Sequence, residues 1–169
     1  MNYPFKVRQA RINDVPEIFN LIRALAEYEK LSHQVTGTAA DLQEHLFGDR
    51  LYAESIVAES DGKIVAFALF FANYSTFLTK PGVYLEDLFV LPDYRRRGIG
   101  KAMLSYLGKL AIDRDAGRLE WSVLDWNESA IAFYQSMGAE VLPDWRTCRV
   151  TGKALSKLSN RQRATNSIL

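Results

Sequence analysis

The stretch SIVAESDGKIVAFALFFA, residues 55–72, limits the folds open to this chain more than any other feature. Two runs rich in apolar and β-branched residues are separated only by Asp61-Gly62. An Asp-Gly pair between such runs favours a two-residue turn, because both residues tolerate the positive φ that a tight hairpin needs. The sequence therefore predicts two adjacent antiparallel strands, and the rest of the fold must complete a sheet around them.

Helix and strand patterns alternate along the remaining chain, with no linker between them. An amphipathic helix is predicted after Asp14, which forms a capping-box pattern with Glu17, and a shorter helix between Thr38 and Gly48. The other predicted elements are strands at 5–10, 83–92 and 118–124, helices at 98–116 and 129–137, and closing strands near Val141 and at Thr147–Val150. This order indicates one mixed α/β (α+β) domain over residues 1–155, followed by a polar C-terminal tail at 156–169.

Composition excludes several classes of protein. The 169 residues, 48% of them hydrophobic, are enough for one sizeable core, and the net charge of +1 gives no bulk attraction to nucleic acid or membrane. No apolar run reaches the roughly 18 residues that span a bilayer, and the N-terminus lacks an apolar stretch of the signal-peptide type. A single cysteine, Cys148, and two distant histidines, His33 and His45, favour a reducing, cytoplasmic location and no metal site.

The motif RRRGIGK, residues 95–101, conflicts with the helix that follows it. Cations there face the positive end of the helix macrodipole, and each interior glycine costs roughly 1 kcal/mol relative to alanine. A solvated charge run leaves both penalties unexplained. A P-loop or a dinucleotide-binding loop would need other residues at three positions, where the chain has Arg95, Ala102 and Met103. A polyphosphate bound by free backbone N–H groups at the helix N-terminus, with the arginines bonding its oxygens, offsets both penalties.

The same motif resembles the acetyl-CoA signature of the GNAT N-acetyltransferase superfamily, Gln/Arg-x-x-Gly-x-Gly/Ala, with Arg95, Gly98 and Gly100 at its fixed positions. The segments YLEDLFVLPDYR, VLDWNESAIAFYQSMGA and LIRALAEYEKL resemble the spermidine/spermine (diamine) N-acetyltransferase branch, most closely its thialysine N-acetyltransferases. The likeness covers most of residues 5–155 in order. It implies the GNAT fold, a twisted, mixed, mostly antiparallel sheet that is splayed at a central β-bulge and flanked by helices.

The resemblance also implies acetyl-CoA as co-substrate, no metal, and a set of coenzyme-binding residues. The pantetheine arm would pair with the backbone of Leu88, Phe89 and Val90, much as an added strand does. The diphosphate would lie on the loop and helix start made by Arg95, Arg96, Arg97, Gly98, Ile99, Gly100 and Lys101. Asn127, Ser129 and Ala130 would contact the arm further along, although Asn127 also fits a plain helix N-cap.

Acetyl transfer to an amine needs a proton acceptor and a proton donor, and the resemblance implies one residue for each. Glu86 matches the acid that takes the ammonium proton through water, unless it only attracts the cation. Asp87 is the weaker candidate, because consecutive strand residues face opposite sides. Tyr134 matches the tyrosine that donates to the coenzyme's leaving sulfur. This implies direct attack in a ternary complex, and Cys148, with no histidine near it in sequence, is expected to be a buried structural thiol.

The resemblance places the acceptor beside the first helix. Positions matching Tyr28, Glu29 and Glu86 line the acceptor site of the branch, and Trp145 falls on its substrate side. Ser75 stands where polyamine specialists carry an acid, which favours a diamino acid such as thialysine over a long polyamine. The expected partners are a small cationic amine and a second copy of the chain, as a homodimer. Two other functions stay open: a coenzyme-binding regulatory module without turnover, and acetylation of a protein lysine or N-terminus.

Overall fold

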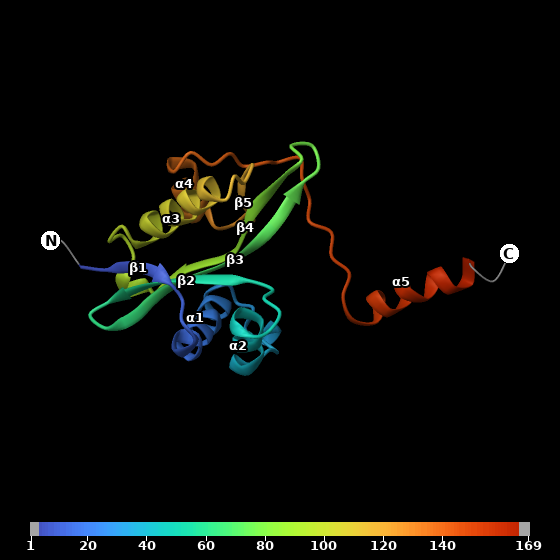
Figure 1. Ribbon diagram of the computed structural model, residues 1–169, viewed down its shortest axis with the longest axis horizontal. Coiled ribbons are helices and arrows are strands. Elements are labelled where there is room, and N and C mark those ends of the chain that lie inside the picture. The colour runs from blue at the N-terminus through green and yellow to red at the C-terminus, as the bar shows by residue number, and fades with distance from the viewer. Residues whose placement is uncertain (1–3, 166–169) are drawn as a thin grey trace. The chain divides into compact units, whose positions relative to one another are not determined.

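The computed structural model describes residues 4–165, with side chains as far as Asn160, in two compact units, Met1–Trp126 and Asn127–Leu169. The first unit is built on a five-stranded sheet in the order β1-β2-β3-β4-β5 (Figure 1). The strands are β1 Lys6–Gln9, β2 Glu54–Ser60, β3 Lys63–Ser75, β4 Lys80–Val90 and β5 Leu119–Trp121. All neighbouring pairs are antiparallel except β4 and β5, which are parallel. The predicted mixed, mostly antiparallel sheet is thus confirmed.

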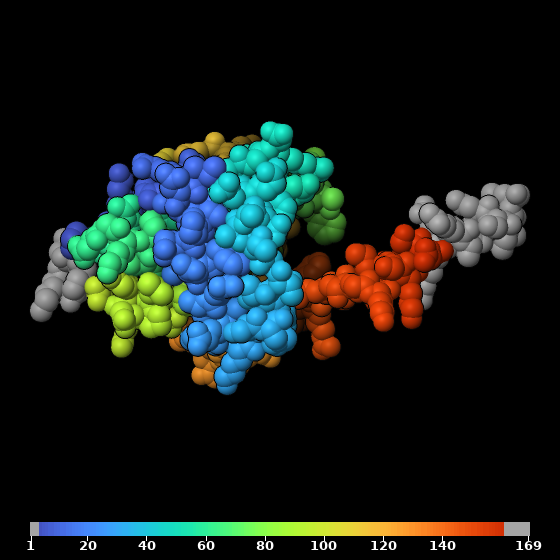
Figure 2. All heavy atoms as spheres, turned by 90° about the horizontal axis from the view of Figure 1, so that it is seen from below, coloured from blue at the N-terminus to red at the C-terminus, as the bar shows by residue number. Residues whose placement is uncertain are grey.

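Helices cover both faces of this sheet. The helices α1 Val15–Tyr28 and α2 Ala39–Phe47 lie on one face, which Figure 2 views directly with α1 in blue and α2 in cyan. The helix α3 Ile99–Asp113 lies on the opposite face, and short 3-10 turns, η1 to η3, occur at Ile12–Asp14, Ser32–Gln34 and Pro92–Tyr94. Within residues 4–165, none of the helices is long and apolar enough to cross a membrane.

The sheet and its helices are joined by apolar stripes that were visible in the sequence. On the α1 side the core cluster consists of Ile18, Leu21, Val57, Phe67 and Phe89, none of them more than 4% exposed. On the other side α3 buries Ile99, Met103, Leu104, Leu107 and Ala111. Burial of such side chains stabilises the fold by about 1.5–3 kcal/mol for each large one. It is therefore the packing of these stripes that fixes the helices against β3 and β4.

The predicted hairpin at Asp61-Gly62 is confirmed and joins β2 to β3. Both turn residues have positive φ, 50° at Asp61 and 73° at Gly62, as a tight two-residue hairpin turn requires. The register shifts once, between Ala58 and Glu59. This hairpin, with β4 added antiparallel to β3, forms the centre of the sheet.

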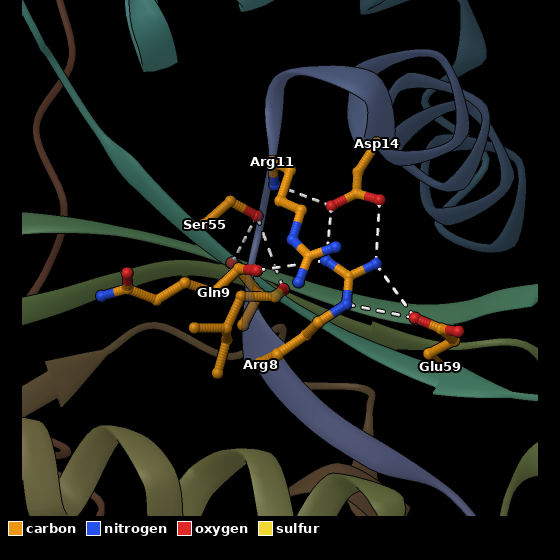
Figure 3. Close-up of polar contacts among 8 residues, drawn as sticks. Arg8, Gln9, Arg11, Asp14, Ser55 and Glu59 are labelled. Carbon is orange, nitrogen blue, oxygen red and sulfur yellow. Dashed lines mark hydrogen bonds and ion pairs between the residues drawn. The ribbon is translucent and has the colours of Figure 1, made fainter.

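The start of α1 differs from the prediction, because Asp14 does not form a capping box with Glu17. Its carboxylate instead accepts hydrogen bonds from Arg8 Nη1 at 2.6 Å, Arg8 Nη2 at 3.0 Å and the Arg11 backbone N–H at 2.7 Å. Arg8 Nε also donates to Glu59 at 3.1 Å, so that one guanidinium joins β1, β2 and the start of α1 (Figure 3). The Asp14 carboxylate thus forms a bidentate, charge-assisted pair with Arg8 instead of capping α1.

Replacing Asp14 by alanine is expected to lower the free energy of unfolding at pH 7 by roughly 2–3 kcal/mol, because Arg8 loses its main partner in a mostly buried site. The hydrogen bond from Arg8 holds the pKa of the Asp14 carboxyl below its ordinary value. The pair therefore stabilises the fold above about pH 4, and this contribution is lost as the pH falls through the lowered pKa. Urea unfolding of both proteins between about pH 2 and 7 measures the difference, which should shrink in acid.

Glu59→Ala is the matched control, because Glu59 bonds the same guanidinium but has a side chain 37% exposed, compared with 11% for Asp14. This variant should lose less stability than Asp14→Ala. Equal losses in the two variants would contradict the assignment of Asp14 as the main partner of Arg8.

The second unit contains the helices α4 Glu128–Ser136 and α5 Gly152–Thr165. The predicted helix at 129–137 is confirmed, but the closing strands near Val141 and at Thr147–Val150 are wrong, since residues 139–151 form no strand. Val141 and Val150 are 42% and 48% exposed, and residues 127–165 contain no strand with which this segment could pair. The polar tail expected at 156–169 is helical as far as Thr165, and its last four positions lie outside the described residues.

Cys148 lies in this same segment. It is a free, exposed thiol, so the prediction of a buried structural cysteine is wrong. The prediction rested on a strand at Thr147–Val150, and the burial fails together with the strand.

Candidate active site

The sheet opens at a bulge in the middle of β4. In the pairing of β3 with β4, Leu69 lies opposite Asp87 and Phe70 opposite Leu85, which leaves Glu86 as the extra residue. On its other side, β4 pairs with β5 only from Val83 to Leu85. Beyond Leu85, no strand among residues 4–126 pairs with that edge of β4. The splayed sheet with a central bulge is confirmed, and Glu86 is the residue at which it opens.

The open edge presents backbone groups of β4. The Leu91 N–H donates to the Val65 carbonyl on β3 at 3.0 Å. Each residue of a strand directs its own N–H and carbonyl to one side, and the side alternates along the strand. Since Leu91 faces β3, the N–H and carbonyl of Val90 and Leu88 face the open edge. The Val90 carbonyl accepts a hydrogen bond there from Arg95 Nε at 2.9 Å. Of the three predicted residues, Leu88 directs its N–H and carbonyl to this edge and Val90 its N–H, whereas Phe89 faces β3 and is only 4% exposed.

The loop that leads from β4 into α3 is bent by two left-handed residues. Arg96 has φ 58° and Gly98, the N-cap of α3, has φ 85°. No side chain caps this helix start, so the first N–H groups of α3 have no side-chain acceptor. A left-handed residue followed by a helical one turns successive N–H groups into one concavity, which suits an anion. The residues of RRRGIGK that disfavour a helix thus lie where the backbone turns left-handed and the first N–H groups of α3 lack a side-chain acceptor.

Arg95, the first arginine of the motif, contacts groups of the protein itself. Besides its bond to Val90, its guanidinium carbon lies 4.8 Å from the ring centroid of Tyr28 and 5.5 Å from that of Phe89. Arg97 lies over Tyr94, at 4.9 Å, and Arg96 is exposed. The three arginines, which look equivalent in the sequence, therefore have three different surroundings.

Carboxylates from β4 and α1 converge beside the bulge. Burial, and then the negative charges of Glu86 and Glu29, raise the pKa of the Asp87 carboxyl to about 6. Burial also raises the pKa of the Glu29 carboxyl. The structure thus brings the predicted residues Glu86 and Glu29 into electrostatic contact with Asp87, while Glu86 itself is exposed. Such an acidic site attracts an ammonium group.

Aromatic rings border this acidic site. Tyr28, predicted to line the acceptor site, lies 6.1 Å from Trp126 between ring centroids. The sequence did not predict that Trp126 lies beside Tyr28, or that Asp87 is the acid whose pKa is raised by its neighbours. The two consecutive acids in YLED were a usable signal, but strict alternation, which the bulge interrupts, argued against their acting together.

The remaining predicted residues lie in the second unit. Asn127 is the N-cap of α4, and its side-chain oxygen accepts from the Ala130 N–H at 3.3 Å and from the Ser129 hydroxyl at 3.2 Å. Tyr134 is on α4, with its ring 5.4 Å from that of Phe133, and Trp145 is 78% exposed. The N-cap role of Asn127 is confirmed. The participation of these residues in the site stays a prediction.

Comparison with known proteins identifies the family. Residues 18–139 match the acetyltransferase (GNAT) family. The chain is 36% identical over 167 residues to the thialysine N-epsilon-acetyltransferase of Mus musculus, covering 92% of this chain and 98% of the mouse protein. It is 34% identical over 198 residues to the L-ornithine N5-acetyltransferase of Arabidopsis thaliana, covering 90% and 87%.

A solved structure supports the fold. An integron cassette protein of V. cholerae has a TM-score of 0.77 at 24% identity, covering 94% of this chain and 98% of that protein. The open sheet, the uncapped start of α3 and these matches agree with one another. The chain therefore belongs to the acetyltransferase (GNAT) family and is an N-acetyltransferase.

Proposed function

We propose that this protein transfers the acetyl group of acetyl-CoA to the primary amine of a small cationic acceptor. The observation that carries the proposal is the convergence of Glu29, Glu86 and Asp87 at the point where β4 leaves the sheet. An acidic site for an ammonium group thus adjoins an open strand edge and an uncapped helix start, which suit the two parts of the coenzyme.

The residues around β4 and α3 fit the coenzyme. The diphosphate would be bound by the backbone N–H groups at Gly98, Ile99, Gly100 and Lys101, with Arg96 and Arg97 adding charge-assisted hydrogen bonds. The pantetheine arm would pair with Leu88 and Val90 along the open edge, and Phe89 would hold that edge in place from the core. Asn127, Ser129, Ala130 and Tyr134 complete the proposed coenzyme site. No metal takes part in the proposed reaction.

The acceptor must lose a proton before it can attack. An alkylammonium with a pKa near 10.4 is neutral in only about one part in 2,500 at pH 7, a deficit of roughly 4.6 kcal/mol. We assign proton removal to Glu86, because its exposed carboxylate can pass the proton through water to solvent. The more buried Asp87 holds the ammonium, since a bound cation relieves its repulsion by Glu86 and Glu29.

The leaving coenzyme thiolate must gain a proton. If the coenzyme thiol titrates near 8.5, a phenol of pKa about 10 is an uphill donor by about 2 kcal/mol. Tyr134 would therefore stabilise the developing thiolate chiefly by a hydrogen bond that strengthens as charge builds up. The nitrogen attacks the thioester carbonyl directly, without an acyl-enzyme. The carbon–sulfur bond then breaks, the nitrogen releases a proton as the amide forms, and the thiolate takes up one proton to give the free thiol.

A short diamino acid is the acceptor that the residues favour. The two relatives described above are named for thialysine and for L-ornithine, and both compounds carry a side-chain amine on an amino acid. Ser75 is buried and its hydroxyl accepts the Leu78 N–H at 3.3 Å, so this position adds no charge for the distant end of a polyamine. Tyr28, Glu29 and Trp145 are the proposed acceptor contacts, and a cytoplasmic homodimer is the proposed state.

A thiol-release assay with acetyl-CoA tests this function. The panel should contain thialysine, ornithine, spermidine, a lysine peptide and an N-terminal peptide. Release that depends on the diamino acids supports the proposal. Release with peptides alone would indicate a protein acetyltransferase, and binding of acetyl-CoA without release from any amine would indicate a regulatory module.

Gly98→Ala is expected to weaken acetyl-CoA binding by at least about ten-fold, measured by calorimetric titration, because alanine disfavours the φ of 85° that aims the N–H groups of α3. Gly62→Ala is a close control, because Gly62 also has positive φ, 73°, and at neither glycine would a Cβ meet an atom within 4 Å. Both variants should lose a similar amount of stability, about 1–2 kcal/mol. Equal affinity for acetyl-CoA in the two variants would contradict the proposed diphosphate site.

A further inference from the structure

We propose that Arg95 is a positioning residue for the acceptor side: its guanidinium holds Tyr28 of α1 against the end of β4, and it does not bind the coenzyme's phosphates. This inference rests on the proposed function, and it assigns to the first residue of the RRRGIG motif a different task from that of Arg96 and Arg97. It would make one side chain the physical link between the coenzyme loop and the helix that carries Glu29.

Three contacts fix the Arg95 side chain. Its Nε donates to the Val90 carbonyl at 2.9 Å, which directs the guanidinium toward β4. The guanidinium carbon is then 4.8 Å from the Tyr28 centroid and 5.5 Å from the Phe89 centroid, within the range of a cation–π contact for both rings. One side chain therefore touches the loop's own strand, the core and α1.

The surroundings of Arg95 are those of a structural contact. Its Nε donates to a backbone carbonyl, and its guanidinium carbon lies within cation–π range of two protein rings. Only a planar guanidinium can stack on a ring while donating in its own plane, and a lysine cannot reproduce this arrangement. Arg95 and Arg96 are both exposed, but only Arg96 takes a left-handed backbone conformation beside the uncapped start of α3.

Tyr28 is the residue through which this contact reaches the acceptor. It immediately precedes Glu29, whose charge acts on Asp87, and its ring also approaches Trp126 at 6.1 Å between centroids. Arg95 and Trp126 are thus both neighbours of one ring at the end of α1. Loss of the Arg95 contact should loosen this end of α1 and so weaken the acceptor site, while the N–H groups of α3 remain in place.

Kinetics with two acetyl donors separate the two roles. Arg95→Gln should raise the KM for the amine three- to ten-fold, as loss of an exposed cation–π contact and a hydrogen bond implies. The same increase should occur with S-acetylpantetheine, a donor that has no diphosphate. Arg96→Gln should raise the KM for acetyl-CoA and leave reactions with S-acetylpantetheine unaffected. If Arg95→Gln instead behaves as Arg96→Gln does, Arg95 binds phosphate and the proposal is wrong.

Thermal unfolding without ligand supplies a test that does not depend on activity. Arg95→Gln should lower the melting temperature by roughly 2–4 °C, about the effect of one lost contact in a chain of this size. If Arg95 served only to bind an anion, Arg95→Gln should raise the melting temperature or leave it unchanged. The substitution would then only relieve the repulsion of Arg95 by Arg96 and Arg97. The effect should vanish in a Tyr28→Leu background and persist with Tyr28→Phe, which keeps the ring.

The two proposals fail in different ways. Wild-type protein that acetylates no amine overturns the proposed function, and the melting cycle alone then decides whether Arg95 holds Tyr28. Additive losses in Arg95→Gln and Tyr28→Leu, in a wild type that is active, overturn the role of Arg95 and leave the proposed function intact.

Discussion

Tyr134→Phe is expected to lower kcat by about 100- to 1,000-fold, while the KM for acetyl-CoA changes by less than about three-fold. The variant keeps the ring and loses only the hydroxyl that would hydrogen-bond the leaving sulfur. That interaction strengthens as negative charge develops, so its loss affects the transition state far more than the bound ground state. Steady-state kinetics with the best acceptor of the panel, at several concentrations of acetyl-CoA, give both parameters.

Phe133→Leu is the control for packing, because Phe133 is on the same helix and its ring lies 5.4 Å from that of Tyr134. It should alter stability without a comparable loss of kcat. An unchanged kcat in Tyr134→Phe would remove Tyr134 from the chemistry, and equal kcat losses in the two variants would reduce its role to that of an aromatic packing residue.

Asp87→Asn is expected to lower kcat/KM for the amine by about 100-fold, because a partly desolvated ammonium loses its charged partner. With its pKa raised to about 6, Asp87 must lose its proton to bind the cation, so wild-type kcat/KM should fall as the pH drops below about 6. The variant should lack this acidic limb. A pH–rate profile of both proteins between about pH 5 and 8.5 measures the change.

The same substitution should stabilise the protein at neutral pH. A carboxyl whose folded-state pKa is raised from 3.8 to about 6 is penalised when ionised, by up to about 3 kcal/mol. The penalty is absent below about pH 4, grows between about pH 4 and 6, and is complete above that. Asp87→Asn should therefore gain stability relative to wild type as the pH rises through this range, as melting temperatures can record.

Glu86→Gln is the matched variant for Asp87→Asn, since it neutralises the neighbouring, exposed carboxylate. It should lower kcat with little change in the KM for the amine, and it should give no comparable gain in stability. If Asp87→Asn instead lowers kcat with little change in the KM for the amine, and Glu86→Gln lowers kcat/KM for the amine, then Asp87 takes the proton and Glu86 holds the cation.

Much of the first unit could be predicted because its signals are local. Asp61-Gly62 determines its own turn, and the apolar stripes of α1 and α3 depend only on residues within each helix. Gly98 and Gly100 disfavour a helix at their own positions, so the unusual start of α3 could be recognised from the sequence. Where a structural cause lies within a few residues of its effect, the sequence predicts it.

The differences arise from contacts between distant residues. Arg95 and Tyr28 are far apart in the chain, so nothing in RRRGIGK distinguishes Arg95 from its two neighbours. Asp14 forms its ion pair with Arg8 of β1, and local capping rules do not consider such a partner. The segment around Val141 has the composition of a strand, but a strand forms only where a neighbouring strand completes its hydrogen bonds.

The left-handed backbone at Arg96 and Gly98 bears on how fast a ligand is captured. Because the fold already holds this loop bent, its conformational freedom is lost once, during folding, and not again at each binding event. We therefore expect a ligand bound by this loop to associate without a slow ordering step, at a rate set by diffusion and electrostatic steering. The corresponding disadvantage is that the protein without ligand keeps Arg96 of this loop in an unfavourable backbone conformation.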